Sequence, residues 1–329
     1  MRLLTRCAVL LRPDRSLAHV RSSGLIALEA PRQRRRRLTG DDVTRRPDWI
    51  HAVLMSGLLA TALAAPLSAQ WLSYRDSTIP RTKDGKPDLT ASAPRLDGKP
   101  DLSGVWEVVP DKIDFAQLLG PAAAEFAATA PTDLPPAISK YVLNIMADLK
   151  PEEDPSRPEA KALLQQRMAG FGKDIPTSHC QPGGVPFSTL IAPFKMVQTP
   201  RQIVMLLEDN NPPRQIYLDG RKLPDDPWPS WMGYSSGRWE GDALVAETHG
   251  FNNRSWLDGI GHPRSEAMRV VERFHRRDVG HMDVEMTFDD PKMYTRAFTI
   301  KFGLRLIPDT DVLESICAEN EKDRVHLDR

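Results

Sequence analysis

The stretch His281-Met-Asp-Val-Glu-Met-Thr-Phe288 carries the clearest structural pattern in this chain of 329 residues. Its even-numbered positions are all apolar, and its odd-numbered positions are all polar or charged. Because successive side chains of a β-strand point to opposite faces, this alternation predicts a strand with one buried and one solvated face. Burial on one face is typical of antiparallel sheets, so the stretch favours an antiparallel β fold.

Apolar runs of strand length occur on both sides of this stretch and are separated by turn residues such as Asp209-Asn-Asn-Pro-Pro213. We expect further strands at 102–109, 194–199, 202–208, 214–218, 243–249, 267–276, 295–302 and 312–317. The strands do not alternate regularly with helices, which argues against a parallel sheet. The pattern predicts a mainly β domain whose antiparallel meander closes into a barrel, with a β-sandwich as the alternative.

A small helical insertion is expected around 137–171. Between 138 and 149, apolar side chains recur at helical spacing, namely Ile138, Tyr141, Val142, Ile145 and Leu149. A second helix is predicted from 158 to 171, because Pro158 suits the first turn of a helix and glycines follow near its end.

The longest apolar stretch of the chain, residues 49–69, has the pattern of an export signal. Arg45 and Arg46 precede it, and small residues end it. A transmembrane anchor is the alternative, but Pro66 and the many small residues make a poor membrane span. We therefore expect a signal peptide, a periplasmic or secreted protein, and no stable membrane anchor after cleavage.

Four segments follow from this assignment. We expect 1–42 to be an over-extended start of the sequence or a disordered basic arm, 43–69 the signal peptide, 70–102 an extended proline-rich strap, and 103–329 the β-rich domain. Residues 1–69 carry 12 Lys and Arg against 5 Asp and Glu, so the rest of this formally neutral chain has a net charge of −7. An acidic domain of this kind is not expected to bind nucleic acid.

The cysteines divide at the same boundary. Cys7 precedes the expected signal, which leaves Cys180 and Cys317 as an even pair. In an exported protein such a pair predicts a disulfide, and two independent buried thiols are the alternative. Neither cysteine belongs to a Cys-x-x-Cys motif, so a metal site at these residues is not expected, and no cofactor is predicted.

Several blocks of the expected strap and domain match one family. They are Asp97-Gly-Lys-Pro-Asp-Leu-Ser-Gly-Val-Trp106, Pro193-Phe-Lys-Met-Val-Gln-Thr-Pro200, Trp231-Met-Gly-Tyr-Ser-Ser-Gly-Arg-Trp-Glu-Gly-Asp242, Gly261-His-Pro-Arg-Ser-Glu266 and Cys317-Ala-Glu-Asn-Glu321. The chain thereby resembles an uncharacterised family of exported bacterial proteins. This resemblance implies export and no particular activity. Gly104-Val105-Trp106 is also similar to the Gly-x-Trp opening of lipocalin-type barrels, which implies a lipocalin-like barrel.

Aromatic residues concentrate in one part of the predicted domain. Rings give large contact areas and stack on aromatic or sugar ligands, so this cluster is a candidate ligand site. Packing in the core and at the barrel end is the alternative. The candidate ligand-binding residues are Trp228, Trp231, Tyr234, Arg238, Trp239 and Trp256.

His262 is the best candidate for a functional imidazole. Asp258 and Glu266 lie four residues away on either side, and a histidine with a carboxylate is a common acid/base pair. Glycine and proline interrupt the segment, so we expect a loop, and a histidine bonded to backbone groups is the alternative.

No metal site is predicted, although three residues could converge across a hairpin to form one: His275, His281 and Asp283. Cross-strand ion pairs are the favoured role of the other charged residues in this region, Arg269, Glu272, Arg273 and Glu285.

Three functional hypotheses follow. The first is an exported β-barrel that binds a small, partly apolar or aromatic ligand. The second is an exported hydrolase or isomerase that uses a His/carboxylate pair, and the third is a structural or partner-binding envelope protein. The chain has no Gly-x-Ser-x-Gly, His-Glu-x-x-His, P-loop or Gly-x-Gly-x-x-Gly motif, which removes the commonest hydrolase, metalloprotease and nucleotide-binding classes. Whether the protein is an enzyme, and its oligomeric state, are left open.

Overall fold

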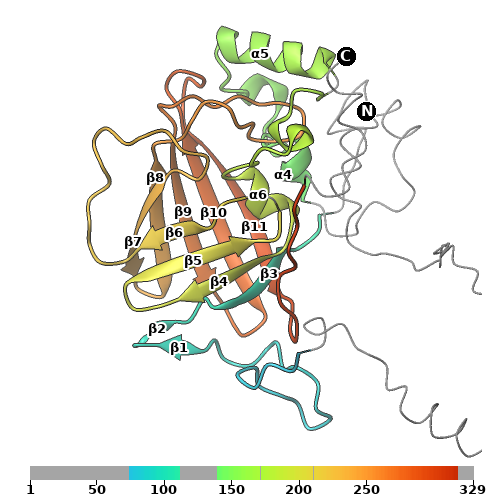
Figure 1. Cartoon of the computed structure of the whole chain (residues 1–329), viewed down its shortest axis with the longest axis vertical. Helices are drawn as coiled ribbons and strands as arrows, with labels where there is room; N and C mark the ends of the chain where they lie inside the picture. The colour runs from blue at the N-terminus through green and yellow to red at the C-terminus, as the bar shows by residue number, and fades with distance from the viewer. Residues whose placement is uncertain (1–73, 112–138, 171, 210, 318–329) are drawn as a thin grey trace, which may run out of the picture. The chain divides into compact units, whose positions relative to one another are not determined.

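The structure is a computed structural model that describes residues 74–111, 139–170, 172–209 and 211–317, so the expected segments 1–42 and 43–69 lie outside the described residues. In the described part, nine strands form a closed barrel (Figure 1). The strands are β3 (Gly104–Val108), β4 (Phe194–Gln198), β5 (Gln202–Leu207), β6 (Arg214–Tyr217), β7 (Tyr234–Glu240), β8 (Ala243–His249), β9 (Arg269–Arg276), β10 (His281–Asp289) and β11 (Phe298–Leu306). The predicted β-barrel is confirmed, and the sandwich alternative is wrong.

The barrel is mixed rather than wholly antiparallel. Strands that follow one another in sequence are paired, and β11 pairs with β3 to close the ring. Only the pair β6–β7 is parallel among these nine strands. A closed ring with an odd number of strands cannot be antiparallel throughout, because alternating directions conflict where the ring closes. The connection 218–233 removes this conflict by returning the chain so that β7 runs in the direction of β6.

Strand β7 is the one barrel strand that the sequence does not predict. Its inward positions are Ser235, Gly237 and the half-buried Trp239, so two of the three have no apolar side chain to bury. A Cβ at Gly237 would lie 2.8 Å from Leu218 and 2.9 Å from Ile216, so a side chain there would displace these neighbours. At Gly237, side chains from β6 and β8 and from the residue after β6 pack directly against the backbone of β7, which takes the place of a buried side chain on this strand.

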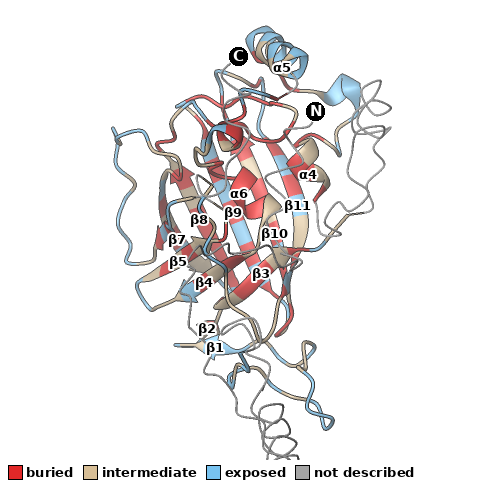
Figure 2. Cartoon of the chain, turned by 45° about the vertical axis from the view of Figure 1, so that its right-hand side comes forward, coloured by how far each residue is buried: buried red, intermediate tan, exposed pale blue. Residues whose placement is uncertain are grey.

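The alternation that predicts β10 is confirmed by burial. Met282, Val284, Met286 and Phe288 are 0–2% exposed and face the interior, and the intervening residues face outward. The neighbouring strand β9 alternates in the same way, with buried residues at its even positions. These inward faces form the core of the barrel, and Figure 2 shows the red buried positions alternating along the strands.

The insertion between β3 and β4 lies at one end of the barrel (Figure 1). It contains α4 (Lys140–Leu143), η1 (Pro151–Glu153), α5 (Pro158–Ala169), η2 (Pro176–His179) and α6 (Phe187–Ile191). The prediction of a helix over 158–171 is close to α5, but the helix predicted over 138–149 ends after one turn. It ends there because the backbone N–H of Ile145 donates to the Asp258 carboxylate at 2.7 Å instead of continuing the helix. Helix α6 is not predicted.

The described part of the proline-rich strap, residues 74–102, lies at the opposite end of the barrel from these helices (Figure 1). It contains the short hairpin β1 (Arg95–Leu96) and β2 (Lys99–Pro100). Asp97 and Gly98 form the turn with φ of 50° and 77°, the positive values that a two-residue hairpin turn needs. Backbone hydrogen bonds from Val279 and Gly280 to Ala91 and Leu89 attach the strap to the barrel.

The last described segment, residues 307–317, is not a strand. The prediction of a strand over 312–317 is therefore wrong. After Ile307, whose N–H donates to the carbonyl of Val105, no residue of this segment enters a backbone–backbone hydrogen bond within the described part of the chain. The ring is already closed by β11 and β3, so neither of these strands has a free edge for another strand to join.

Candidate functional site

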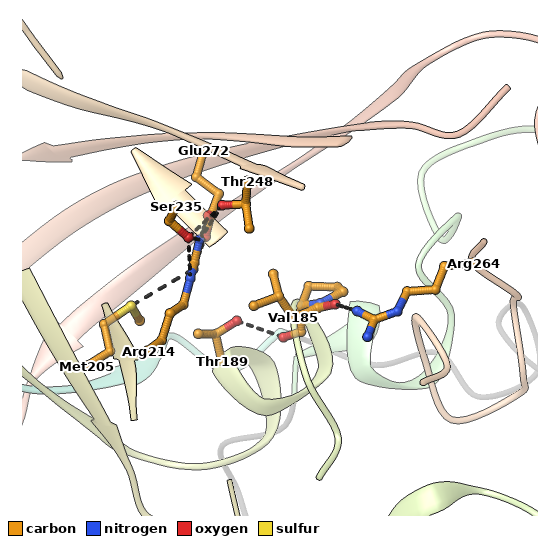
Figure 3. Close-up of polar contacts among 9 residues, drawn as sticks. Val185, Thr189, Met205, Arg214, Ser235, Thr248, Arg264 and Glu272 are labelled. Atoms are coloured by element: carbon orange, nitrogen blue, oxygen red, sulfur yellow. Dashed lines mark hydrogen bonds and ion pairs between the residues drawn. The ribbon is translucent and has the colours of Figure 1, made fainter. Parts of the chain in front are cut away.

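An ion pair lies inside the barrel. Arg214 on β6 is 1% exposed and Glu272 on β9 is 0% exposed, and both guanidinium nitrogens at the tip of Arg214 contact the carboxylate, one at 2.8 Å. The hydroxyls of Ser235 and Thr248 accept further hydrogen bonds from the guanidinium, as Figure 3 shows. Figure 3 also shows Met205 at the other side of Arg214, where its sulfur lies 3.9 Å from the guanidinium.

The expected outward role of Glu272 is wrong. Glu272 does not form a cross-strand pair on the solvated face. It points into the barrel and is the ion-pair partner of Arg214. A sequence signal exists, because Glu272 has the same parity as Val270 and Phe274, which are buried. Arg214 likewise shares its face with the buried Ile216. Alternation along each strand places both residues inside the barrel, but their charge favours the opposite prediction, an exposed position.

Large side chains occupy the remainder of the barrel interior. Trp106, Phe194, Phe274 and Phe288 are at most 1% exposed and belong to one continuous core. The two cavities described below lie at the rim of the barrel and on its outer surface rather than among these side chains. The interior therefore has the character of a packed core with one satisfied ion pair.

The aromatic residues proposed to bind a ligand are dispersed. Trp228 is 84% exposed on the connection 218–233, whereas Trp256 is 4% exposed and lies under the guanidinium of Arg167. Trp231 is half-buried beneath Arg254, 4.8 Å from the ring centre. None of the six candidates lines either cavity described below. The others are Tyr234 and Trp239, five residues apart on β7, and Arg238, which forms ion pairs with Glu240 and Glu247 on the outer surface.

Two of the three acid/base candidates meet. The ring Nδ1 of His262 lies 2.5 Å from an Asp258 oxygen, and both residues are buried. Asp258 also accepts hydrogen bonds from the backbone N–H groups of Ile145, Gly261 and His262, so it fixes this loop to the turn after α4. Glu266 is not part of the pair, because its exposed carboxylate contacts Lys292.

The loop of Asp258 and His262 lies against α5. The guanidinium of Arg167 donates to the carbonyl of Gly261 at 2.9 Å and packs over the ring of Trp256 at 4.7 Å. Burial lowers the pKa of Arg167 to about 10, which shows how far this contact is withdrawn from water. Tyr294 donates from its hydroxyl to the carbonyl of Pro263, and burial raises its pKa well above the usual value.

The candidate metal ligands engage separate partners. His275 and Asp283 are directly opposite on β9 and β10, but Asp283 pairs with Arg277. His281 instead contacts Asp278 at 2.8 Å through Nδ1. In the described part of the chain, no three His, Cys, Asp or Glu side chains form a group that could hold a metal ion.

Arg264 is a second arginine withdrawn from water, near the helical end of the barrel. It is 2% exposed, and its guanidinium donates to the carbonyl oxygens of Val185, Trp231 and Asn252. Burial lowers its pKa to about 9, since these acceptors carry no full negative charge. Figure 3 shows it contacting the loop before α6, so Arg264 connects three loops at this end.

A cleft of about 300 Å³ lies between the proline-rich strap, the rim of the barrel and residues 307–311. We call it the strap cleft. Its walls include apolar side chains from the strap, from β3, β4 and β11 and from the segments next to them: Ile79, Val105, Val197, Val279, Leu306 and Ile307. Both the volume and the mixed lining fall within the range of sites that bind small molecules.

Arg276 is a buried charged residue in the lining of the strap cleft. It is 4% exposed and packs over the ring of Trp106 at 4.9 Å. Its guanidinium donates to the carbonyl oxygens of Asp101, Ser103, Asp278 and Val279, which joins strap and barrel. Burial lowers the pKa of Arg276 to about 10, and the neighbouring carboxylates of Asp101 and Asp278 oppose this shift.

The last described segment forms another wall of the same cleft. Asp309 and Asp311 line it and pair with Arg81 of the strap and Lys195 of β4, the latter at 2.7 Å. The segment ends at Cys317, which is bonded to Cys180, so the predicted disulfide is confirmed. It connects residues 137 apart in sequence.

A more open groove of about 520 Å³ lies on the outer surface beside β5 and β6. Arg221 stacks on Tyr217 there at 3.6 Å and contacts Asp219, whose pKa it lowers to about 2. The other arginine, Arg201, is 82% exposed. This groove is more open to solvent and has fewer lining residues than the strap cleft, so the strap cleft is the stronger candidate site.

Comparison of the chain with protein-family models, with curated proteins and with solved structures found no match. The resemblance to an exported bacterial family therefore stays a prediction. No helix among residues 74–111, 139–170, 172–209 and 211–317 is both long and apolar enough to cross a membrane.

Proposed function

We propose that this protein binds a small, partly apolar ligand in the strap cleft. The observation that carries the proposal is the cleft itself, about 300 Å³ with apolar side chains and a buried arginine in its lining. This keeps the ligand-binding hypothesis but moves the site away from the aromatic residues 228–256. A ligand there replaces water against Val105, Val197 and Ile307, which favours binding by the hydrophobic effect.

Arg276 supports a ligand that has a polar acceptor at one end. Its guanidinium has five N–H groups, and four hydrogen bonds to backbone carbonyls are present in the described residues. One N–H can therefore donate to a carbonyl, hydroxyl or carboxylate oxygen of a ligand. The carboxylates of Asp309 and Asp311 form ion pairs with Arg81 and Lys195, so they repel a ligand's oxygen acceptor less strongly than free carboxylates would.

Export remains part of the proposal. The signal-like stretch 49–69 supports it, and the Cys180–Cys317 disulfide suits an oxidising compartment. The measurement is N-terminal sequencing of the protein recovered from the periplasm or medium of a bacterial host. A protein that stays in the cytoplasm with residues 49–69 attached contradicts export without affecting the ligand site.

Two matched variants test the ligand site. Val197 lines the strap cleft and Val271 lies on the outer face of β9, and both are 38% exposed. Val197→Trp fills the cleft, whereas Val271→Trp adds the same side chain to an open surface. We expect small amphipathic compounds found by ligand-observed NMR to bind the wild type and Val271→Trp and to lose affinity at least tenfold for Val197→Trp. Equal binding to all three proteins refutes the site.

The Asp258–His262 contact favours a second candidate, acid/base catalysis. A buried carboxylate that holds Nδ1 leaves Nε2 as the nitrogen able to exchange a proton with a substrate. The test is a panel of hydrolase and isomerase substrates assayed with the wild type and His262→Gln. Any activity that survives in a folded His262→Gln protein excludes His262 as its acid or base.

A further inference from the structure

The C-terminal segment, residues 307–317, crosses the outside of the barrel from its strap end towards the helical insertion (Figure 1). It is attached at successive points to different parts of the fold. Asp309 contacts Arg81 of the strap, and Asp311 contacts Lys195 of β4. Cys317 then forms the disulfide with Cys180 after η2.

Asp309 accepts two hydrogen bonds from Arg81 and one from the backbone N–H of Asp76, but beyond Asp309 the noncovalent attachments of this segment are weak. The Asp311–Lys195 side chains are 38% and 34% exposed, and ion pairs at such positions contribute little to stability. The apolar side chains Leu313 and Ile316 are 38% and 43% exposed, so they bury little surface against the barrel. Beyond Ile307, backbone–backbone hydrogen bonds to the described residues are absent. Segments with these properties open at low free-energy cost.

The disulfide is the strongest of these attachments. It is also accessible, because Cys180 and Cys317 are both of intermediate exposure. A small dithiol can therefore reach the bond from solvent. The same segment supplies Ile307, Asp309, Thr310 and Asp311 to the wall of the strap cleft, so release of its end affects the cleft.

We propose that the Cys180–Cys317 disulfide locks the C-terminal segment as a movable wall of the strap cleft, and that reduction by a dithiol releases the wall and opens the cleft. This rests on the proposed function, because it assumes that the strap cleft receives the ligand. In the reaction, a thiolate of the dithiol attacks one sulfur of the disulfide and expels the other cysteine as a thiolate, which leaves a mixed disulfide. The second thiolate of the dithiol then attacks the dithiol sulfur of this mixed disulfide and expels the remaining cysteine thiolate. The dithiol is oxidised to its cyclic disulfide, and Cys180 and Cys317 become two thiols.

Two measurements on the same samples test the proposal. Limited proteolysis with glutamyl endopeptidase, followed by mass spectrometry, reports cleavage after the exposed Glu314 of the C-terminal segment and within strands β8–β10 separately. Stopped-flow fluorescence with 1-anilinonaphthalene-8-sulfonate reports entry of an apolar anion into the cleft. The samples are oxidised protein, protein reduced with dithiothreitol, and the variant Cys180→Ser/Cys317→Ser. Val197→Trp, with the cleft filled, identifies the fluorescence that comes from this site.

We expect reduction to raise the rate of cleavage after Glu314 while β8–β10 stay uncleaved, and to raise the association rate of the probe at least about tenfold. The double variant reproduces both effects and no longer responds to dithiothreitol. Unchanged cleavage after Glu314, unchanged probe entry despite a released segment, or cleavage within β8–β10 each overturns the proposal. If Val197→Trp leaves the probe signal of oxidised protein intact, the ligand site itself is refuted, while the cleavage data still report on the lock.

Discussion

Removal of one partner from the Arg214–Glu272 ion pair is expected to be among the most damaging single changes in the barrel. The two side chains are 1% and 0% exposed, so the remaining charge has no access to water. Breaking such a pair costs about 3–5 kcal/mol, because a buried charge is left without its counterion. We expect Glu272→Met and Arg214→Met each to lower the free energy of unfolding by this amount.

The double variant distinguishes the cost of an unpaired charge from the contribution of the pair. Arg214→Met/Glu272→Met removes both charges and keeps apolar volume, and the hydroxyls of Ser235 and Thr248 stay bonded to each other at 2.9 Å. The two single costs sum to about 6–10 kcal/mol, but we expect the double variant to lose less than about 2 kcal/mol, a coupling of roughly 4 kcal/mol or more. Urea unfolding followed by tryptophan fluorescence and far-ultraviolet circular dichroism gives these values.

The barrel contains a matched control for this cycle. Arg273 and Glu240 also pair across the barrel sheet, 2.7 Å apart, but both side chains are 44% exposed. The same cycle of methionine substitutions at this pair is expected to give a coupling below about 1 kcal/mol. A double variant at Arg214 and Glu272 that loses the full sum of the single costs refutes the reasoning. The reasoning is also refuted if the single variants at Arg214 and Glu272 lose no more unfolding free energy than the single variants at Arg273 and Glu240.

Three further predictions concern other parts of the fold. Burial raises the pKa of Glu208 to about 7, so the wild type loses stability as pH rises from about 4.5 to 7, and Glu208→Gln removes this slope. Thermal unfolding should show equal stability near pH 4 and an advantage for the variant of up to about 3 kcal/mol at pH 8; an equal difference at both values contradicts the assignment. Cys180→Ser/Cys317→Ser, which opens a closed loop spanning 137 residues, should lower the free energy of unfolding by about 2–5 kcal/mol in urea, and an unchanged midpoint contradicts this. Gly237→Ala places a Cβ 2.9 Å from Ile216 and should cost about 1–3 kcal/mol in the same assay, whereas a neutral result shows that β6 and β7 can separate.

The strand prediction succeeds where one side of a strand is apolar. The apolar side chains from Met282 to Phe288 mark the buried face of β10 in the sequence, because backbone geometry alone sets the direction of alternate side chains. On β9, the buried Glu272 and Arg276 interrupt such a pattern. Strand β7 has no such pattern, because a glycine at position 237 is required by close contact with neighbouring side chains and not by burial of an apolar side chain. The helix predicted over 138–149 fails for a related reason, because Asp258, far away in sequence, takes the N–H of Ile145.

The candidate site shows the same division. The spacing of Asp258, His262 and Glu266 in the sequence makes them acid/base candidates. In the structure Asp258 contacts His262, whereas Glu266 forms an ion pair with Lys292. The aromatic residues attract attention by composition alone, which carries no information about where rings converge. The residues that line the strap cleft come from the strap, four strands and the C-terminal segment, and they share no sequence motif.

By itself, the sequence determined the mainly β character, the buried face of β10, and the pair of cysteines that forms the disulfide. These properties depend on local geometry or on the small number of available partners. Only the tertiary structure decided that β6 and β7 run parallel, that Arg214 meets Glu272 across 58 residues, and that the cavity lies at the rim rather than in the interior. The physical reason is that barrel closure sets strand direction and brings together side chains distant in sequence, and neither effect leaves a periodic pattern along the chain.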